Sequence, residues 1–397
     1  PVSGQKTICR PISHFALKDR IILSITNKYL TDALDQYFYP NSFAFRASQG
    51  GKRVNHHASV QNILDYKSKY KGKRLWVSEC DIKKFFDSVH HTIVKKQYQK
   101  LIAKLNRDYP GAFDKRADGI FKKYLECYTF PKNVLPYNSA TAKSKNYWEK
   151  HKKPAGEFGW VEDDLKQLGL FKDVRKARIG IPQGGALSGL IANIVLNYAD
   201  QQLVQSNDQK LLYVRFCDDM VLIYPTKKTS VLYTESYYKA LKDLHLIPHK
   251  PKPSLTYTAD SFWDRSTKSK SPYKWSLDAF PWFSFVGYEI HYSGDLRVRK
   301  SSLKKEKAKQ KEVVQKVIWA IENGLRKNDH TVLQSTVNRL IGMSVGRVKL
   351  DNYKTVESEM CWVSGFTLLK DNKHIRSQLR GLDNNRARNI SRLKKVL

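Results

Sequence analysis

The sequence lacks several features that define whole classes of protein. No run of about 18 apolar residues is present, and no apolar signal segment opens the chain. The five cysteines are far apart, with neither a Cys-x-x-Cys pair nor a histidine pair at a zinc spacing, so disulfides and structural zinc are not expected. No segment repeats at a fixed period. These absences predict a soluble, cytoplasmic protein that does not associate with a membrane.

Acidic residues are scarce. The 397 residues include 37 Asp and Glu against 71 Lys and Arg, which gives a formal net charge of +34. The basic residues are spread along the whole length, as expected of a protein that follows a phosphate backbone. Such charge gives affinity for nucleic acid without reading its sequence. The length predicts two or three lobes rather than one compact domain.

Hydrophobic patterning predicts two acidic positions on β-structure. Residues 75–80 alternate as a strand, and Asp81 follows at the end of that strand. Residues 211–224 form two β-rich arms around a short polar centre, which predicts a hairpin with Asp218 and Asp219 at its tip. A flexible Gly-Ile-Pro-Gln-Gly-Gly turn then stands before a predicted helix over 186–204.

The remaining pattern is mixed. Residues around 21–30 have helical spacing, and residues from 300 onward become helical with 22 Lys or Arg against nine Asp or Glu.

His90 and His91 are adjacent, and on a helix such neighbours point about 100° apart, which favours a helix surface over a metal site. Three further segments are predicted: a helix over 230–246, a strand or tight hairpin over 283–290, and an irregular basic insertion over 110–176.

Carboxylates on separate elements suit nucleotidyl transfer. Two metal ions about 3.5–4 Å apart must bridge the attacking and leaving oxygens in that chemistry, and Mg²⁺ prefers such oxygen ligands, with Mn²⁺ as the alternative ion. An Asp-Asp pair alone marks a turn in most proteins. Here the order of four signals outweighs that interpretation: a strand ending in Asp81, the Pro-Gln-Gly turn, the Asp218-Asp219 hairpin and a Phe-x-Phe-Val-Gly-Tyr strand.

In this order the sequence resembles reverse transcriptases, particularly the bacterial group II intron, retron and defence-associated enzymes. The resemblance runs over about residues 9–290 and rests on residues 81–87 (Asp-Ile-Lys-Lys-Phe-Phe-Asp), 180–184, 216–219 and 285–288. Phe216 stands where the family usually has Tyr. The resemblance implies an α+β right-hand polymerase fold with a ferredoxin-like antiparallel palm, fingers and an α-helical thumb. It implies these regions: fingers over 1–75, palm over 76–109, the basic insertion or fingers over 110–176, palm over 177–299, and a basic helical thumb or RNA-binding region over 300–397.

The resemblance also implies roles for individual residues. Asp81, Asp218 and Asp219 would be the catalytic metal ligands, with Ile82 as a further metal contact. Phe86 would be the aromatic gate that excludes a ribose 2′-hydroxyl. The implied nucleotide contacts are Arg10, Lys18, Arg20, Phe86, Pro182, Gln183, Gly184, Lys250 and Lys252. The implied primer grip is Phe285, Val286, Gly287 and Tyr288.

The predicted function is RNA-directed DNA synthesis from dNTPs with two Mg²⁺ ions, on an RNA template and from a nucleic-acid or protein primer. A dedicated noncoding RNA in antiphage defence is the preferred setting, by family analogy. Two alternatives stay open: an RNA-dependent RNA polymerase, because the Asp81 to Asp87 spacing resembles a ribose-accepting pair, and an RNA-binding scaffold or maturase-like component. An oligomer or a partner protein is compatible with the sequence.

Overall fold

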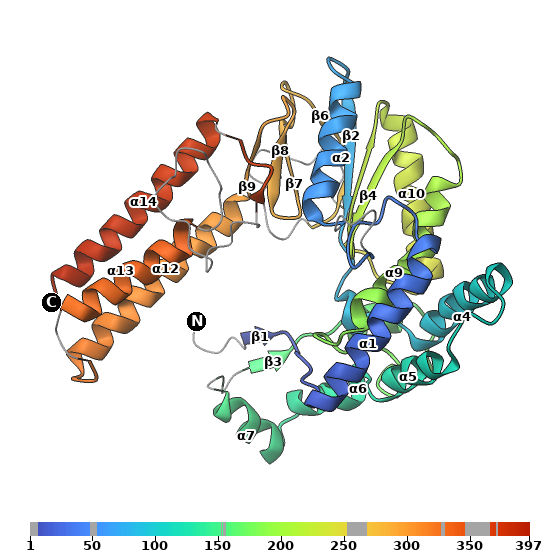
Figure 1. Ribbon diagram of the computed structural model, residues 1–397, viewed down its shortest axis with the longest axis horizontal. Helices are drawn as coiled ribbons and strands as arrows, with labels where there is room; N and C mark the ends of the chain where they lie inside the picture. Colours follow the sequence, from blue (N-terminus) through green and yellow to red (C-terminus); the bar gives the residue numbers. More distant parts are fainter. Residues whose placement is uncertain are drawn as a thin grey trace. The chain divides into compact units, whose positions relative to one another are not determined.

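The computed structural model describes residues 7–47, 54–151, 153, 156–251, 268–326, 330–345, 366–370 and 372–397 (Figure 1). The elements mix helices and strands, which confirms the predicted α and β content. The chain forms two compact units, Pro1–Ser59 with Arg74–Lys274, and Val60–Lys73 with Trp275–Leu397. Among the described helices, none is long and apolar enough to cross a membrane.

A four-stranded sheet forms the centre of the first unit. Its strand order is β4-β5-β2-β6, and β5 pairs antiparallel with both β4 and β2. The apolar sequence of β5 suits this central place, because all but its first residue are buried. The predicted strand at 75–80 and the predicted hairpin are confirmed. The strands are β2 (Leu75–Cys80), β4 (Leu212–Phe216), β5 (Asp219–Tyr224) and β6 (Lys270–Trp275).

Two helices connect this sheet to the rest of the core. Helix α10 (Lys227–Asp243) packs against β2, β5 and α9 (Ser188–Val204), and α9 in turn packs against α4 (His91–Asp108). Helix α9 is apolar nearly all round, as a helix enclosed by the core should be. The predicted limits of 230–246 were wrong for α10, because Thr226 already provides an extended N-cap and His245, with a φ of 56°, ends the helical path.

The segment 110–176 was predicted to be irregular, and this was wrong. Asp114 caps α5 by accepting a hydrogen bond from the Arg116 N–H, and Phe121, Tyr124 and Leu125 form its buried face. Thr129 and Thr141 cap two further helices in the same way. The segment's elements are α5 (Lys115–Glu126), α6 (Phe130–Asn133), η2 (Leu135–Asn138), α7 (Ala142–Lys150), β3 (Gly156–Phe158) and α8 (Glu162–Gln167).

The N-terminal part of the first unit packs on this helical segment. Strand β1 (Thr7–Cys9) pairs parallel with β3, and α1 (Leu17–Leu34) packs against α5 and α4. The short elements η1 (Asp35–Tyr37) and α3 (Phe85–Ser88) follow α1 and β2. Helix α1 confirms the predicted helix and extends it at both ends.

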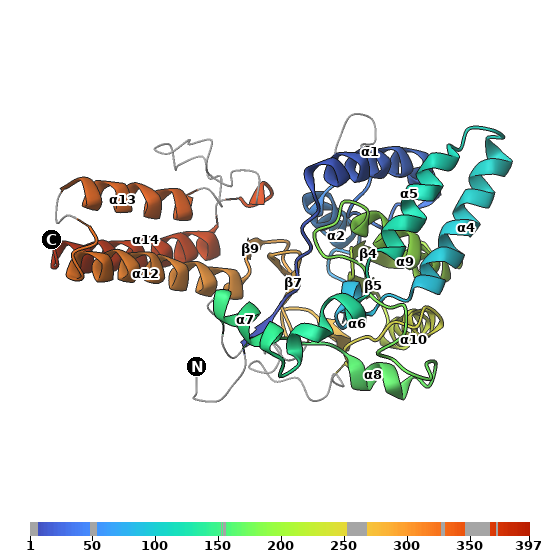
Figure 2. The same cartoon turned by 90° about the horizontal axis from the view of Figure 1, so that it is seen from below.

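The second unit combines a three-stranded antiparallel sheet with long helices. The helices α12, α13 and α14 lie side by side (Figures 1 and 2) around Val313, Val314, Val317, Leu340 and Leu393. The predicted helical C-terminal region is thereby confirmed in its described part, whereas Tyr353, Cys361 and Trp362 lie outside the described residues. The elements are α2 (His56–Lys69), β7 (Trp282–Phe285), β8 (Tyr288–His291), β9 (Leu296–Val298), α12 (Lys300–Glu322), α13 (His330–Val345) and α14 (Lys373–Lys394).

Candidate functional site

The three acidic residues singled out from the sequence meet at one end of the central sheet. Asp81 directly follows β2, and the register that pairs Cys80 with Met220 brings it beside the start of β5, where Asp219 lies. Cys217 takes a φ of 58° in the tight turn that carries Asp218. Burial raises the pKa of Asp218, and the negative charge of Asp81 raises that pKa further. The carboxylates are therefore close enough to repel one another.

Two basic side chains flank Asp81, and sequence reasoning missed both. Lys268 Nζ lies 3.1 Å from Asp81 Oδ2, and His249 Nε2 lies 3.5 Å from the same oxygen. His249 is brought there by backbone pairing, since its N–H donates to the Asp81 carbonyl at 2.9 Å. Burial first, and then the charge of Lys268, lower the pKa of His249, which favours the neutral imidazole.

The acidic end of the sheet fits a cation. Repelling carboxylates beside a lysine ammonium form a site whose charge a divalent ion could balance with oxygen ligands. In the part of the chain that the structure describes, no three His, Cys, Asp or Glu side chains already surround a common point. Ile82 is buried, and its backbone bridges to Pro248, so only its carbonyl oxygen is suited to a metal contact.

A fully buried ion pair lies next to the turn that carries Asp218. Arg215 Nη2 donates to Asp200 Oδ2 at 2.6 Å and Nε donates to Oδ1 at 2.7 Å, and both side chains are completely buried. Arg215 Nη1 also donates to the Cys217 carbonyl at 2.9 Å. Tyr213 adds a hydroxyl that donates to Asp200 at 2.6 Å. The guanidinium thus fixes the backbone immediately before Asp218.

The predicted Pro-Gln-Gly turn is held against the segment that follows Asp81. The Ile181 N–H donates to the Phe86 carbonyl at 2.7 Å, and the Gly180 N–H donates to the Val89 carbonyl at 2.8 Å. Gln183 Nε2 donates to Asp87 Oδ1 at 2.6 Å. The two motifs, about 96 residues apart, therefore form one surface beside Phe86.

The turn itself depends on its glycines and on Ser188. Gly184 has a φ of 91°, which L side chains rarely adopt. A Cβ on Gly185 would lie 1.8 Å from the Tyr124 hydroxyl oxygen. That hydroxyl lies 2.7 Å from Ser188 Oγ, which donates to the Pro182 carbonyl at 2.5 Å. These contacts fix the backbone on both sides of Gln183.

Asp87 makes the stability of this surface dependent on pH. Its side chain is fully buried, Oδ2 has no hydrogen-bond partner among the described residues, and burial raises the pKa of Asp87 from 3.8 to about 6. The folded state therefore binds the proton more tightly than the unfolded state. The stabilisation from this group is complete below about pH 4, and it is lost as the pH rises through 6, for a total on the order of 3 kcal/mol.

We expect Asp87→Asn to remove this dependence. Urea unfolding of both proteins at pH 4.5 and pH 7.5 measures it, and the variant should gain stability relative to wild type at the higher pH. The comparison cancels groups that both proteins share, such as His91. An equal difference between the two proteins at both pH values would contradict this account of Asp87.

The surface position predicted for His90 and His91 was wrong. His91 is buried, its Nε2 lies 2.7 Å from the Gly180 carbonyl oxygen, and burial lowers its pKa to about 4. His90 is partly buried beside Phe171 and His245. The reason is that α4 begins under the turn at Gly180, where a neutral imidazole can hydrogen-bond backbone. His91 is therefore a structural support of the turn.

The predicted basic nucleotide contacts occupy exposed positions. Arg10 lies close enough to Asp87 to lower its pKa, and Lys18 and Arg20 are exposed on the first turn of α1. Lys250 is exposed, next to His249. Lys252 lies outside the described residues. Their roles stay predictions.

The predicted primer-grip residues belong to the second compact unit. Phe285 and Tyr288 are buried at the ends of β7 and β8, and the Tyr288 ring packs edge-on against Phe366 at 5.1 Å. Val286 and Gly287 form the turn between the strands, with φ angles of 41° and 90°. Of these four residues, only Val286 and Gly287 are partly exposed, and their contact with a primer stays a prediction.

Comparisons with known proteins identify part of the chain. Residues 141–290 match the model of the family described as reverse transcriptase (RNA-dependent DNA polymerase). Protein YkfC of Escherichia coli (strain K12) is 26% identical over an alignment of 252 positions that covers 56% of this chain and 52% of YkfC.

Solved telomerases are distant structural matches. The telomerase of Candida albicans, in complex with a TWJ fragment of telomeric RNA, gives a TM-score of 0.37 at 13% identity, over 95% of this chain and 51% of that one. Apo telomerase from Candida tropicalis gives a TM-score of 0.40 at 12% identity, over 95% and 55%. This chain spans about half the length of YkfC and of these telomerases.

The matched segment contains the Pro182-Gln183-Gly184 turn and the Asp218-Asp219 hairpin, whereas Asp81 lies before it. Its sequence match, rather than the distant structural likeness, supports the resemblance found in the motifs. Residues 141–290 are thus similar in sequence to the reverse transcriptase family.

Proposed function

We propose that this protein is an RNA-directed DNA polymerase that copies an RNA template into DNA. The observation that carries the proposal is the meeting of Asp81 with the Asp218-Asp219 hairpin, beside a Pro-Gln-Gly turn in a reverse transcriptase domain. In this proposal the four-stranded sheet with α9 and α10 is the palm. The proposed domain limits are those implied by the resemblance: fingers over 1–75, palm over 76–109 and 177–299, an insertion over 110–176 and a thumb over 300–397.

The carboxylates would hold divalent metal, with Asp81, Asp218 and Asp219 as side-chain ligands and the Ile82 carbonyl as a further contact. We propose two Mg²⁺ ions, with Mn²⁺ as the alternative. Bound there, such ions would supply charge stabilisation at a reacting phosphate. Burial and repulsion raise the pKa of Asp218, and a cation would lower it again. Lys268, 3.1 Å from Asp81, would then be released from its ion pair.

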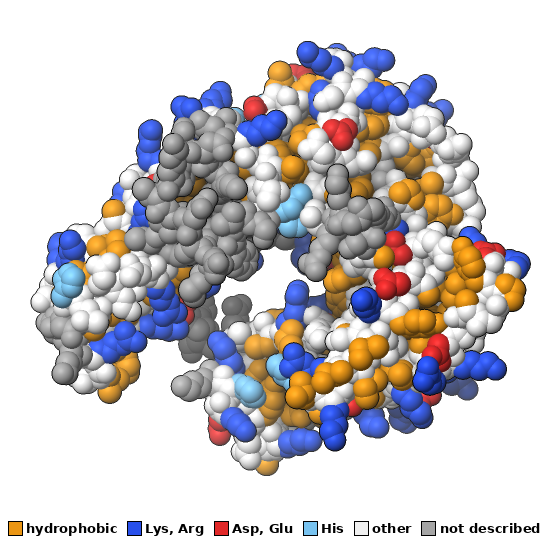
Figure 3. Space-filling view, in the orientation of Figure 1, with side chains coloured by type: hydrophobic (Ala, Val, Ile, Leu, Met, Phe, Trp, Pro, Cys, Tyr) orange, Lys and Arg blue, Asp and Glu red, His pale blue; other side chains and the backbone are white. Residues whose placement is uncertain are grey.

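The charge of the protein suits a nucleic-acid partner. Lys and Arg side chains are spread over the face shown in Figure 3 rather than gathered in one patch. Such a distribution suits an extended contact with phosphates, in accord with a net charge of +34. We propose an RNA template, a nucleic-acid or protein primer and dNTPs as the partners. The proposed noncoding RNA and the defence setting rest on the family resemblance alone.

The structure also bears on the RNA polymerase alternative. Asp87, which could accept a ribose hydroxyl, is fully buried and hydrogen-bonded to Gln183. Phe86 is partly exposed, and its ring packs edge-on against the buried Phe85, with ring centroids 5.3 Å apart. The accessible group is thus an aromatic ring rather than a carboxylate, which favours deoxynucleotides.

Removing the ring of Phe86 should relax this choice of sugar. We expect Phe86→Val to lower the preference for dNTPs over NTPs by on the order of 10²-fold, because the space for a 2′-hydroxyl opens. Primer extension on an RNA template, with each nucleotide type titrated separately, measures the ratio of kcat/KM values. Phe86→Tyr keeps the ring and is the matched control. Unchanged selectivity in Phe86→Val would contradict the gate, and wild-type extension by NTPs alone would contradict the proposed function.

A further inference from the structure

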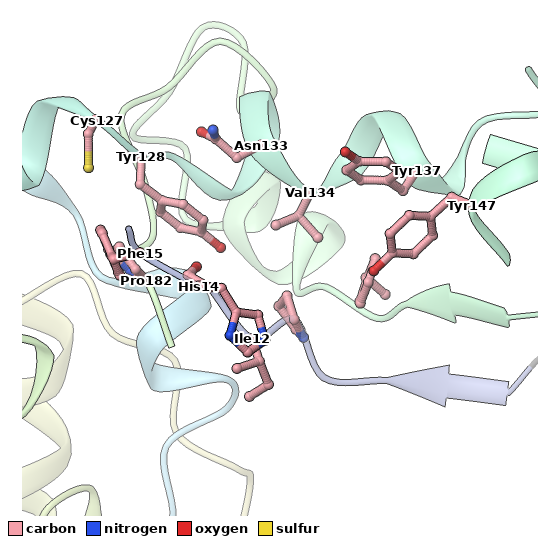
Figure 4. A pocket seen from close by; sticks show the side chains of 13 residues that line it. Ile12, His14, Phe15, Cys127, Tyr128, Asn133, Val134, Tyr137, Tyr147 and Pro182 are labelled. Carbon is pink, nitrogen blue, oxygen red and sulfur yellow. The ribbon is translucent and has the colours of Figure 1, made fainter. Parts of the chain in front are cut away.

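A cavity of about 340 Å³ lies behind the Pro-Gln-Gly turn in the first unit (Figure 4). Figure 4 shows Tyr128 and Pro182 at one end, Tyr137 and Tyr147 at the other, and Ile12 between them. The polymerase mechanism proposed above makes no use of this space. Its volume is at the small end of the roughly 300–1,000 Å³ typical of small-molecule sites. This volume can hold a single flat ring system.

The walls of the cavity are fixed by hydrogen bonds between distant segments. Trp148 Nε1 donates to the Tyr137 carbonyl at 2.8 Å. Asn138 Nδ2 donates to the Phe158 carbonyl at 2.7 Å, and Asn138 Oδ1 accepts from the Phe158 N–H at 2.8 Å. The pairing of β1 with β3 joins the extended segment that precedes Ile12 to the same wall. The space is therefore preformed and needs no ligand to hold it open.

The lining has the chemistry of a nucleobase site. Tyr128, Tyr137, Tyr147 and Phe158 supply aromatic surface, and none of the described lining residues is Asp, Glu, Lys or Arg. The Tyr128 side chain is only 7% exposed, and its hydroxyl points into the cavity without a hydrogen-bond partner among the described residues. A buried hydroxyl without a partner is unfavourable, so a ligand with a polar edge would satisfy it.

One lysine lies near this lining. Lys143 is exposed, and its Nζ lies 5.5 Å from the centre of the Tyr137 ring. A neutral interior with a cation at its edge suits a base whose phosphate stays outside. A carboxylate ligand or an isolated phosphate would meet no Lys or Arg side chain among the described lining residues.

The position of the cavity indicates which base would enter it. Pro182 is part of the wall, and the N–H of Ser13, another lining residue, donates to the Gln183 carbonyl at 2.8 Å. The cavity thus shares a wall with the turn proposed to contact the incoming nucleotide. We propose that it binds one unpaired nucleobase of the template strand, ahead of the position being copied. This assignment rests on the proposed function.

Binding measurements without dNTPs test the site separately from polymerisation. RNA templates annealed to a DNA primer would carry a single abasic position, moved one nucleotide at a time beyond the primer end. We expect one position to weaken binding on the order of fivefold or more, because one stacked base is lost. The double variant Tyr128→Phe/Tyr147→Leu should bind the abasic template no more weakly than it binds the unmodified template. Tyr109→Phe, at the exposed C-cap of α4, is the matched control.

Adenosine monophosphate tests whether the base in the cavity comes from the template strand or from a free nucleotide. If a template base fills the cavity, millimolar adenosine monophosphate should not change the binding of the intact template, and it should restore part of the binding lost at the sensitive abasic position. Equal affinity for all abasic positions would overturn the site. Binding of adenosine monophosphate in the cavity with the same affinity in the presence and in the absence of the intact template would overturn the template assignment. A normal abasic profile from a protein that extends no primer would contradict the polymerase proposal and leave the base site intact.

Discussion

Replacing Asp218 with Asn is expected to reduce RNA-templated dNTP incorporation on the order of 10³-fold, because a metal-binding charge is lost where negative charge develops on phosphate. The substitution keeps the shape of the side chain. Since burial and the neighbouring Asp81 raise the pKa of Asp218, its ionised form opposes folding at neutral pH. The variant should therefore be at least as stable as wild type.

Single-turnover extension and urea unfolding at pH 7.5 measure the two effects together. Asp163→Asn, an exposed position on α8, is the matched control and should change neither. Loss of activity with retained stability is the result expected of a site residue. Wild-type activity in the Asp218 variant would contradict the assignment of the hairpin, and unfolding of the variant would contradict the electrostatic account of Asp218.

Replacing Arg215 with Met is expected to destabilise the first unit by about 3–5 kcal/mol, because it leaves the carboxylate of Asp200 buried without its ionic partner. Adding Asp200→Leu should restore most of the unfolding free energy, since a buried ion pair can be replaced by apolar side chains of similar volume at little cost. Urea unfolding of the two single variants and the double variant measures the coupling.

Activity separates the two roles of Arg215. The double variant still lacks the hydrogen bond from Arg215 to the Cys217 carbonyl, so its rate of dNTP incorporation should stay low even though the unit is folded. Recovery of both stability and activity would show that the guanidinium supports the fold alone. Failure of the double variant to regain stability would contradict the proposed energetics of the ion pair.

Local patterning in the sequence was sufficient for the elements that carry the acidic residues. The strand before Asp81 is recognisable by its alternating pattern. The arms around Asp218 are recognisable because a strand buried on both faces is a nearly continuous apolar run. Helix α9 is recognisable by its helical spacing. The segment 115–126 carried a usable signal as well, in the spacing of Ala117, Phe121, Tyr124 and Leu125, although three lysines and an arginine lie in the same segment.

Other parts of the site depend on contacts between distant segments. Lys268 and His249 reach Asp81 only because the chain after α10 returns to pair with residues 81–83. Nothing local in the sequence specifies that return. The bond from Gln183 to Asp87 and the burial of His91 likewise arise where the turn meets α3 and α4. A local sequence pattern cannot show which charged side chains become buried by contacts with distant segments.

Addition of one nucleotide by the purified protein tests the central claim most directly. The reaction contains a primed RNA template, Mg²⁺ and one dNTP at a time, and the primer is followed at single-nucleotide resolution. We predict that only the dNTP complementary to the first template base extends the primer, that the matching NTP is used far less, and that Asp218→Asn abolishes the product. Extension independent of the template, or no extension with any nucleotide while the protein still binds the primed RNA, would contradict the account and favour an RNA-binding scaffold.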